Sequence, residues 1–179
     1  FIRAQGWDID IWAHHRRGGH ILGLCGGYQM LGKTIAGPQG IEGPAATVQG
    51  LGLLDTVTVL EGQKTLRAVT GRHLPSGAPF AGYEMHMGVT TGADTARPLV
   101  RFDDGRGDGA ASADGRITGT YVHGLFADAA QRRVWLEPFG ITASGTDYDI
   151  SVDTALDEIA TILEAHLDVD GLLAIAGQT

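Results

Sequence analysis

At residues 23–29 the chain reads Gly23-Leu24-Cys25-Gly26-Gly27-Tyr28-Gln29. Apolar residues stand on both sides of this stretch, Ile21-Leu22 before it and Met30-Leu31 after it. An apolar run, a glycine-rich turn and a second apolar run predict a buried strand, a sharp turn and a helix. Cys25 lies at the turn, where the neighbouring glycines remove Cβ atoms that would crowd its thiol. The pattern therefore predicts a nucleophile elbow.

The chemistry expected of Cys25 follows from this position. A helix that begins just after the turn directs its positive N-terminal end at the sulfur, which favours the thiolate. A thiolate attacks carbonyl carbon readily, whereas a thiol does not. The alternative is that Cys25 is a small buried apolar residue, as free cysteines often are. The three surrounding glycines favour the nucleophile.

Composition limits the class of protein. A chain of 179 residues is long enough for one α/β domain with a sizeable core. Its net charge of −8 argues against nucleic acid or an anionic membrane as the main partner. The single cysteine excludes an internal disulfide and a Cys-rich zinc site, and no metal is expected. With no signal peptide and no membrane-spanning run, we expect a cytoplasmic protein.

The chain begins with Phe1, and residues 1–6 have the pattern of the last turns of a helix that ends at a left-handed Gly6. We therefore expect a fragment of a larger protein. A second helix should follow, capped by Asp8, with Ile9, Trp12 and Ala13 on its apolar side.

The remaining elements are expected from apolar periodicity and turn residues. We expect the helix after Cys25 to run to Ala36 and residues 41–53 to form a loop. Residues 103–109 should be a mobile, exposed turn. The strands are expected at residues 20–24, 56–60, 66–70, 80–89, 99–102 and 116–123, with a turn at 61–64. Helices are expected at residues 127–139 and 153–166, the latter capped by Asp153, before a short apolar segment at 172–175.

A cysteine nucleophile needs an imidazole to take its proton. His123 ends the β-type run from Thr118, and the carboxyl end of a strand is where open α/β sheets carry their sites. The alternative for His123 is a core histidine whose ring is bonded to a backbone carbonyl. His86 is the second candidate, and it alternates with Glu84 in a predicted strand, so that the two side chains share one face and can pair.

The other histidines fit the role less well. His20 opens the strand before the elbow but stands five residues from Cys25, about 17 Å away in an extended chain. The remaining four are expected to face solvent, and they are His14, His15, His73 and His166.

Three motifs occur in a characteristic order: residues 23–32, residues 82–88 (Gly-Tyr-Glu-Met-His-Met-Gly) and residues 119–126 (Gly-Thr-Tyr-Val-His-Gly-Leu-Phe). Together they resemble the class I, triad-type glutamine amidotransferases, and within them the cobyric acid synthase branch, in which this domain is C-terminal. The resemblance runs over residues 1–179. It implies an α/β, flavodoxin-like open sheet that lacks its first strands here.

The resemblance also implies roles for single residues. Cys25 would attack the carboxamide of L-glutamine, giving a γ-glutamyl thioester and ammonia, with His123 as general acid and base. The amide of Gly26 would be one oxyanion donor, and Gln29 would help to hold the substrate.

By the same resemblance, the ammonia would pass to an ATP-dependent synthetase domain of the same polypeptide. That domain would amidate side-chain carboxylates of a corrinoid, converting adenosylcobyrinic acid a,c-diamide to cobyric acid in cobalamin biosynthesis. The present chain would need no cofactor. ATP and Mg would belong to the synthetase domain, because no glycine-rich phosphate loop with Lys-Ser or Lys-Thr occurs here.

Two departures from the family pattern matter. Most relatives outside this branch carry a glutamate two residues after the catalytic histidine, where this chain has Leu125. Either a dyad suffices or another carboxylate orients His123. Glu84 is the candidate, with His86 and Tyr83 as possible supporting residues. The Pro-Gly loop that supplies the second oxyanion donor is absent from residues 1–24, so we expect it before Phe1.

Three rival readings remain open at this point. The elbow also resembles that of the amidotransferase subunit acting on a cell-wall lipid precursor, although residues 124–128 favour the corrinoid enzyme. The paralogue that makes the a,c-diamide differs after the glycines of the elbow. The chain could also be a non-catalytic binding module in which Cys25 is a relic.

Overall fold

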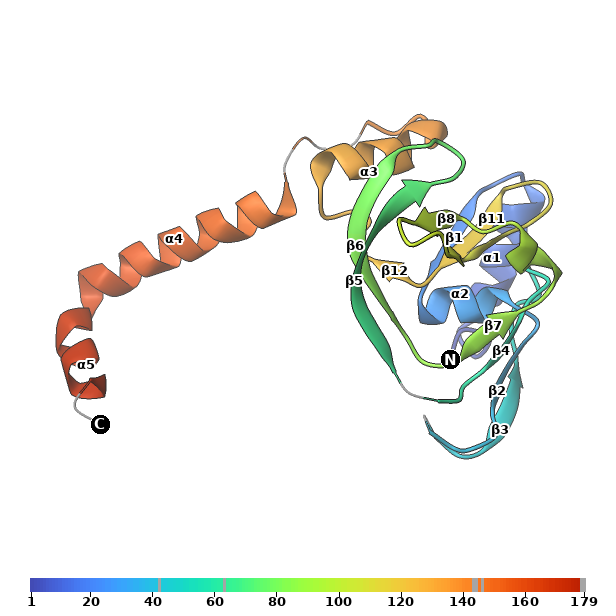
Figure 1. Ribbon diagram of the computed structural model, residues 1–179, viewed down its shortest axis with the longest axis horizontal. Coiled ribbons are helices and arrows are strands. Elements are labelled where there is room, and N and C mark those ends of the chain that lie inside the picture. The colour runs from blue at the N-terminus through green and yellow to red at the C-terminus, as the bar shows by residue number, and fades with distance from the viewer. Residues whose placement is uncertain (42, 63, 143–144, 146, 178–179) are drawn as a thin grey trace. The chain divides into compact units, whose positions relative to one another are not determined.

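The apolar residues before Cys25 form strand β1 (Ile21–Leu24), as the sequence predicts. In the computed structural model, β1 pairs in parallel with β11 (Ile117–Thr120), and β10 (Ala110–Ala111) pairs antiparallel with β11 (Figure 1). Helix α2 (Gly26–Leu31) follows the elbow and lies against β11. A Cβ at Gly119 of β11 would stand 2.1 Å from the Tyr28 ring, so this close packing requires glycine.

The structure describes every residue except 42, 63, 143–144, 146 and 178–179. Two compact units divide it, residues 1–125 and residues 126–179. All three sheets and the first two α-helices belong to the first unit. The predicted mixed α/β class is confirmed, with the strands distributed over three sheets.

Residues 1–7 close in the way expected of a helix end. Gly6 is left-handed with φ 74°, the Trp7 amide donates to the Ile2 carbonyl, and the Gly6 amide donates to the Arg3 carbonyl. Helix α1 (Trp7–Arg16) begins at once. The expected cap at Asp8 is wrong, because Asp8 lies inside the first turn and pairs with Arg3 at 3.1 Å.

The apolar side of α1 also differs from the expectation. Ile9 is exposed, whereas Ile11 and Trp12 pack against the core. That core lies around α2 and β11, and its buried members are Tyr28, Leu31, Leu51, Leu53, Leu54, Ala110, Ile117 and Tyr121.

An antiparallel sheet of five strands carries the second sequence motif and, in β12, the part of the third motif that contains His123. Its strand order is β12-β6-β5-β8-β9, in which β5 and β6 form a long twisted hairpin, drawn in green in Figure 1. The strands are β5 (Thr65–His73), β6 (Pro79–His86), β8 (Val100–Phe102), β9 (Gly107–Asp108) and β12 (Val122–His123).

The third sheet contains the largest errors of the sequence-based expectation. Its order is β3-β2-β4-β7, with strands β2 (Thr34–Gly37), β3 (Ala46–Gln49), β4 (Val57–Val59) and β7 (Val89–Thr91). The helix after the elbow ends at Leu31 because Gly32 is extended, and Ile35 lies in a strand. The expected loop at 41–53 contains β3. Strands β4 and β5 belong to different sheets and form no hairpin, and residue 63 of the expected turn lies outside the described residues. A short 3-10 helix, η1 (Ala93–Ala96), follows β7.

The second unit is helical. It contains α3 (Ala129–Leu136), the 3-10 helix η2 (Glu137–Phe139), α4 (Tyr148–His166) and α5 (Val169–Ala176). Asp128 caps α3 through a bond from the Gln131 amide. Asp153 lies within α4, so it does not begin that helix, and the apolar segment at 172–175 is part of α5.

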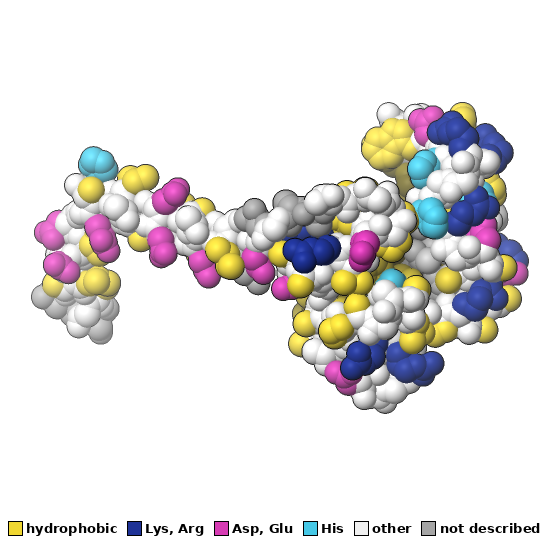
Figure 2. Space-filling model, turned by 90° about the horizontal axis from the view of Figure 1, so that it is seen from above, with side chains coloured by type: hydrophobic (Ala, Val, Ile, Leu, Met, Phe, Trp, Pro, Cys, Tyr) yellow, Lys and Arg dark blue, Asp and Glu magenta, His cyan; other side chains and the backbone are white. Residues whose placement is uncertain are grey.

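Helices α4 and α5 carry acidic and hydrophobic side chains, coloured magenta and yellow in Figure 2, and no lysine or arginine. Their leucines and isoleucines are exposed. No helix among the described residues combines the length and the apolar character that crossing a membrane requires.

Candidate active site

Cys25 has the backbone of a nucleophile elbow. With φ 52° and ψ −116°, it is the only residue other than glycine with positive φ in the described part of the chain. It follows β1 directly and precedes α2, so the predicted order of strand, turn and helix is confirmed. A residue with a side chain in this region of backbone space costs about 1–3 kcal/mol, which the surrounding structure must offset.

The glycines near Cys25 serve two different purposes. A Cβ at Gly23 would lie 2.6 Å from the Leu31 side chain and 2.7 Å from the Tyr28 amide, so Gly23 is required for packing. Around Gly26 and Gly27 there is open space, because no atom outside the adjacent residues and the helix backbone lies within 4 Å of where a Cβ would stand. Packing against the protein interior therefore does not require glycine at positions 26 and 27. These two glycines leave the approach to the thiol unobstructed.

The thiol and the imidazole converge on one backbone oxygen. The Cys25 Sγ donates to the carbonyl oxygen of Met85 at 3.4 Å, and the His123 Nε2 lies 3.2 Å from the same oxygen. The two predicted catalytic residues are thus brought together, although they stand far apart in the chain. The predicted alternative for His123, a bond to a backbone carbonyl, is also observed, and the carbonyl is the one that Cys25 uses.

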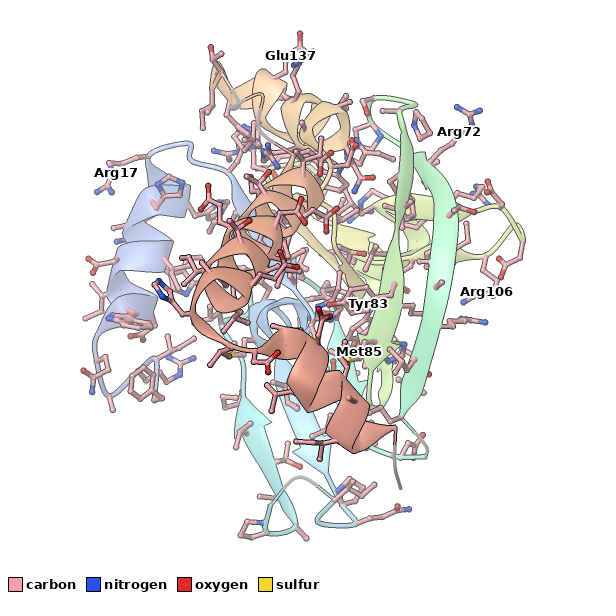
Figure 3. The ribbon with its side chains drawn as sticks, turned by 90° about the vertical axis from the view of Figure 1, so that its left-hand side faces the viewer. Arg17, Arg72, Tyr83, Met85, Arg106 and Glu137 are labelled. Atoms are coloured by element: carbon pink, nitrogen blue, oxygen red, sulfur yellow. The ribbon has the colours of Figure 1, made fainter. Side chains whose placement is uncertain are left out.

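Strand pairing sets the position of His123. On β12, His123 stands opposite Tyr83 of β6, and their rings stack with centroids 5.1 Å apart and an interplanar angle of 10°. Tyr83 and Met85 lie on the same side of β6 in Figure 3, as residues two apart in a strand must. Tyr83 is therefore the residue that supports the ring of His123.

Gln29 lies one helical turn after Cys25, whose carbonyl accepts a bond from the Gln29 amide at 3.2 Å. Its side-chain nitrogen Nε2 donates to the Met87 carbonyl at 3.1 Å and to the Tyr121 hydroxyl at 3.2 Å. The same hydroxyl lies 2.5 Å from the Thr90 Oγ1. Gln29 is thus held in place by Met87, which lies between β6 and β7, and by Tyr121 of the third motif.

Glu84 and His86 pair on one face of β6, as predicted. The Glu84 carboxylate is 3.1 Å from the His86 Nε2, and it accepts a bond from the Arg67 Nε at 2.7 Å. In the register of β6 and β12, Glu84 stands opposite Val122, on the other face from the His123–Tyr83 pair. The structure therefore corrects the expectation that Glu84 orients His123, because its carboxylate orients His86 instead.

His86 in turn supports the third motif. Its ring stacks on Tyr121 with centroids 4.0 Å apart, and its Nδ1 lies 3.1 Å from the Gly88 carbonyl oxygen. Within the described residues, no group of three or more His, Cys, Asp or Glu side chains is arranged to hold a metal ion.

Asp108 is the polar residue near the site that sequence reasoning missed. It was expected in a mobile, exposed turn, but it lies in β9, and its Oδ2 accepts bonds from the Thr120 hydroxyl and the Tyr121 amide. Burial raises the pKa of the Asp108 carboxyl above its usual range, although these two bonds oppose the shift.

We expect Glu84→Gln to destabilise the protein at pH 7 by about 2 kcal/mol, the usual worth of a hydrogen bond to a charged group. Burial alone would raise the pKa of Glu84, but bonds from Arg67 and His86 hold it below 4.5. The carboxylate therefore contributes stability above pH 4.5, and this contribution is lost as the pH falls through the folded-state pKa. Urea unfolding followed by tryptophan fluorescence at pH 7 and pH 4 measures the effect.

The matched control is Asp104→Asn, which removes a solvent-exposed carboxylate. Asp104 pairs with Arg106, whose guanidinium also lies 3.4 Å from the Glu84 carboxylate. This substitution should change stability little. The pKa of Asp108 is shifted in the opposite direction, but wild type and Glu84→Gln share this shift. The stabilities of the two proteins are therefore compared at the same pH. A Glu84→Gln protein as stable as wild type at pH 7 would contradict the assignment.

Comparison with known proteins identifies the class. Residues 1–131 match the family described as the CobB/CobQ-like glutamine amidotransferase domain, and the chain belongs to this family. All three sequence motifs fall within the matched residues. The extent of a single amidotransferase domain over residues 1–179 stays a prediction.

Several curated relatives carry a more specific name. Proteins named cobyric acid synthase from Methylobacterium nodulans and Novosphingobium aromaticivorans are each 61% identical over 175 residues, or 98% of this chain. One from a Caulobacter species is 57% identical over 177 residues. The chain spans 35–36% of the length of these relatives.

Proposed function

We propose that this chain hydrolyses L-glutamine and supplies ammonia, with Cys25 as nucleophile and His123 as general acid and base. The observation that carries the proposal is the convergence of the Cys25 thiol and the His123 imidazole on the Met85 carbonyl at a nucleophile elbow. Catalytic contacts in a free enzyme are often long and tighten when substrate binds, so we expect the thiol and the imidazole to pair directly in the complex with glutamine.

The chemical steps follow from this pair. His123 takes the thiol proton, and the thiolate attacks the carboxamide carbon of glutamine. The oxyanion that forms accepts a bond from the Gly26 amide, which begins α2 and has no carbonyl one turn earlier to bond. The imidazolium gives its proton to the leaving nitrogen, ammonia departs, and a γ-glutamyl thioester remains. Water then releases glutamate and restores the thiol.

The substrate would reach Cys25 over Gly26 and Gly27, where the space is open. Gln29, held through its Nε2 by Met87 and Tyr121, keeps its side-chain oxygen available to the glutamine. Its fixed position allows it to select the substrate without an ordering cost at each turnover.

We further propose that the ammonia is used as in the relatives' printed name, in the synthesis of cobyric acid. An ATP- and Mg-dependent synthetase domain of the same polypeptide would amidate side-chain carboxylates of adenosylcobyrinic acid a,c-diamide in the cytoplasm. The relatives' identity of 54–61% over nearly the whole chain supports this acceptor over the cell-wall lipid precursor.

A glutamine-like chloroketone tests the glutaminase site directly. We expect rapid, stoichiometric alkylation of Cys25, which mass spectrometry locates without ambiguity because the chain has one cysteine. L-Glutamine should protect the thiol, and L-asparagine, one methylene shorter, should not. Labelling that glutamine does not slow would show that Cys25 is a reactive thiol outside any glutamine site, and a non-catalytic module would then be the better reading.

A further inference from the structure

The chain changes sheets between the two predicted catalytic residues. Thr120 is the last residue of β11, which pairs with the strand leading to Cys25, and Val122 is the first residue of β12, which pairs with β6. Tyr121 belongs to neither strand. The geometry of residues 120–122 therefore sets how the sheet that positions Cys25 stands relative to the sheet that positions His123.

The side chain of Asp108 forms hydrogen bonds with this junction. The Asp108 Oδ2 accepts a bond from the Thr120 Oγ1 at 2.5 Å and another from the Tyr121 amide at 2.9 Å. The Thr120 Oγ1 itself accepts a bond from the Val122 amide at 3.1 Å. A strand that leaves its sheet would otherwise bury unpaired backbone amides at this point. Asp108, directly or through Thr120, pairs those of both Tyr121 and Val122.

The same junction residues hold the backbone of the site. The Thr120 carbonyl accepts a bond from the Cys25 amide at 2.9 Å, and the Tyr121 carbonyl accepts one from the Met85 amide at 3.3 Å. Met85 then presents its own carbonyl to the thiol and the imidazole. Each link from Asp108 to the two catalytic groups is thus a hydrogen bond or a peptide unit.

Asp108 is itself fixed from both sides. Its carbonyl accepts a bond from the Leu99 amide at 2.9 Å. The next residue, Gly109, has φ 83°, and a Cβ there would lie 2.1 Å from the Gly119 carbonyl oxygen. Only glycine allows the chain to pass so close to β11, and this passage brings the Asp108 carboxylate to the junction. The carboxylate is therefore placed by rigid backbone.

We infer that Asp108 is a positioning residue for the glutaminase reaction, whose carboxylate holds the sheet junction and thereby sets the placement of His123 relative to Cys25. This inference rests on the proposed function for its kinetic consequence. It assigns no contact between Asp108 and the substrate.

The test compares Asp108→Ala with Asp108→Asn in the full-length protein. The asparagine oxygen can accept the same two bonds, whereas alanine leaves the Tyr121 amide unpaired. We expect Asp108→Ala to lower kcat for glutamine hydrolysis about 10²-fold with KM changed little, since a misplacement of about 1 Å costs this much. Asp108→Asn should have a kcat within about threefold of wild type, because the asparagine oxygen keeps both hydrogen bonds.

The matched control is Asp94→Ala. Asp94 is a buried aspartate in η1, and it accepts a bond from the Asp55 amide at 2.7 Å and pairs with Arg97. Its loss should lower the Tm as much as the loss of Asp108 while leaving kcat unchanged. If both alanine variants lose kcat in proportion to Tm, or if asparagine fails to rescue Asp108, the inference is overturned.

A second readout does not require glutamine. The rate at which iodoacetamide alkylates Cys25 at pH 7 should fall in Asp108→Ala and not in Asp94→Ala, because a displaced imidazole no longer assists the thiol. If wild type hydrolyses no glutamine, the proposed function fails while this rate still decides the role of Asp108. Should Asp108→Ala not fold, Thr120→Val removes the bridging hydroxyl at nearly constant shape, and it must slow both reactions for the inference to stand.

Discussion

Replacing Cys25 with alanine is expected to abolish glutamine-dependent amidation while leaving amidation with an ammonium salt within about threefold of wild type, because in the proposed function the thiol serves only ammonia release. Alanine keeps the Cβ at the strained elbow, so the turn itself is preserved. The measurement is product formation from adenosylcobyrinic acid a,c-diamide in the full-length protein with ATP and Mg, with glutamine or ammonium chloride as nitrogen source.

Comparing the two nitrogen sources separates chemistry from folding. An alanine variant that loses both activities together would show that Cys25 is structural, and the glutaminase assignment would fail. A variant that keeps both would show that ammonia arises elsewhere. Circular dichroism of the variant establishes that the fold is intact before either rate is compared.

The second large effect is expected at His123. His123→Asn should lower glutamine hydrolysis by at least about 10²-fold, the usual contribution of a positioned general acid and base. His86→Asn is the matched control, because His86 is also on the site's strands but pairs with Glu84 and stacks on Tyr121. Its loss should reduce stability or glutamine affinity more than turnover.

The ranking of these two variants is the decisive result. Steady-state glutamate release at saturating glutamine gives kcat for each, and thermal unfolding gives the stability. A larger fall of kcat in His86→Asn than in His123→Asn would move the base to His86. It would also make the shared Met85 carbonyl a structural contact only.

Local sequence predicted the elbow because its determinants are local. Glycine at position 23 is required by contacts within ten residues, to Tyr28 and Leu31. His123 also ends a strand, but the expected single strand at 116–123 is divided at Tyr121 into β11 and β12, which belong to different sheets. These parts of the site depend on short-range sterics, which glycine spacing encodes directly.

The third sheet could not be predicted in the same way. The residues after Leu31 continue an apolar pattern that suits a helix, yet Gly32 turns the chain, and Thr34 and Ile35 pair with β3 and β4. The β-branched side chains were the available signal. Pairing partners 15 and 23 residues away, such as Gln49 and Val57 opposite Thr34, decided the outcome.

The role of Asp108 was hidden for a different reason. The chain contains three Asp-Gly pairs within 12 residues, at 104–105, 108–109 and 114–115, and each is a turn signal by composition. Asp104 and Asp114 bind the backbone and side chains of their own turns. Only Asp108 faces a strand that changes sheets, and this distinction exists only in the folded chain.

The backbone conformation of Cys25 favours the reactivity of the thiol at the expense of the stability of the fold. At φ 52° and ψ −116° a glycine would have a lower conformational energy than any residue with a Cβ, and glycines already stand at the next two positions. A chain optimised for stability alone would have an unbroken run of three glycines here. A cysteine at this position therefore destabilises the turn, and the rest of the fold must offset that cost. The bonds from Cys25 to Thr120 and Met85 contribute most directly.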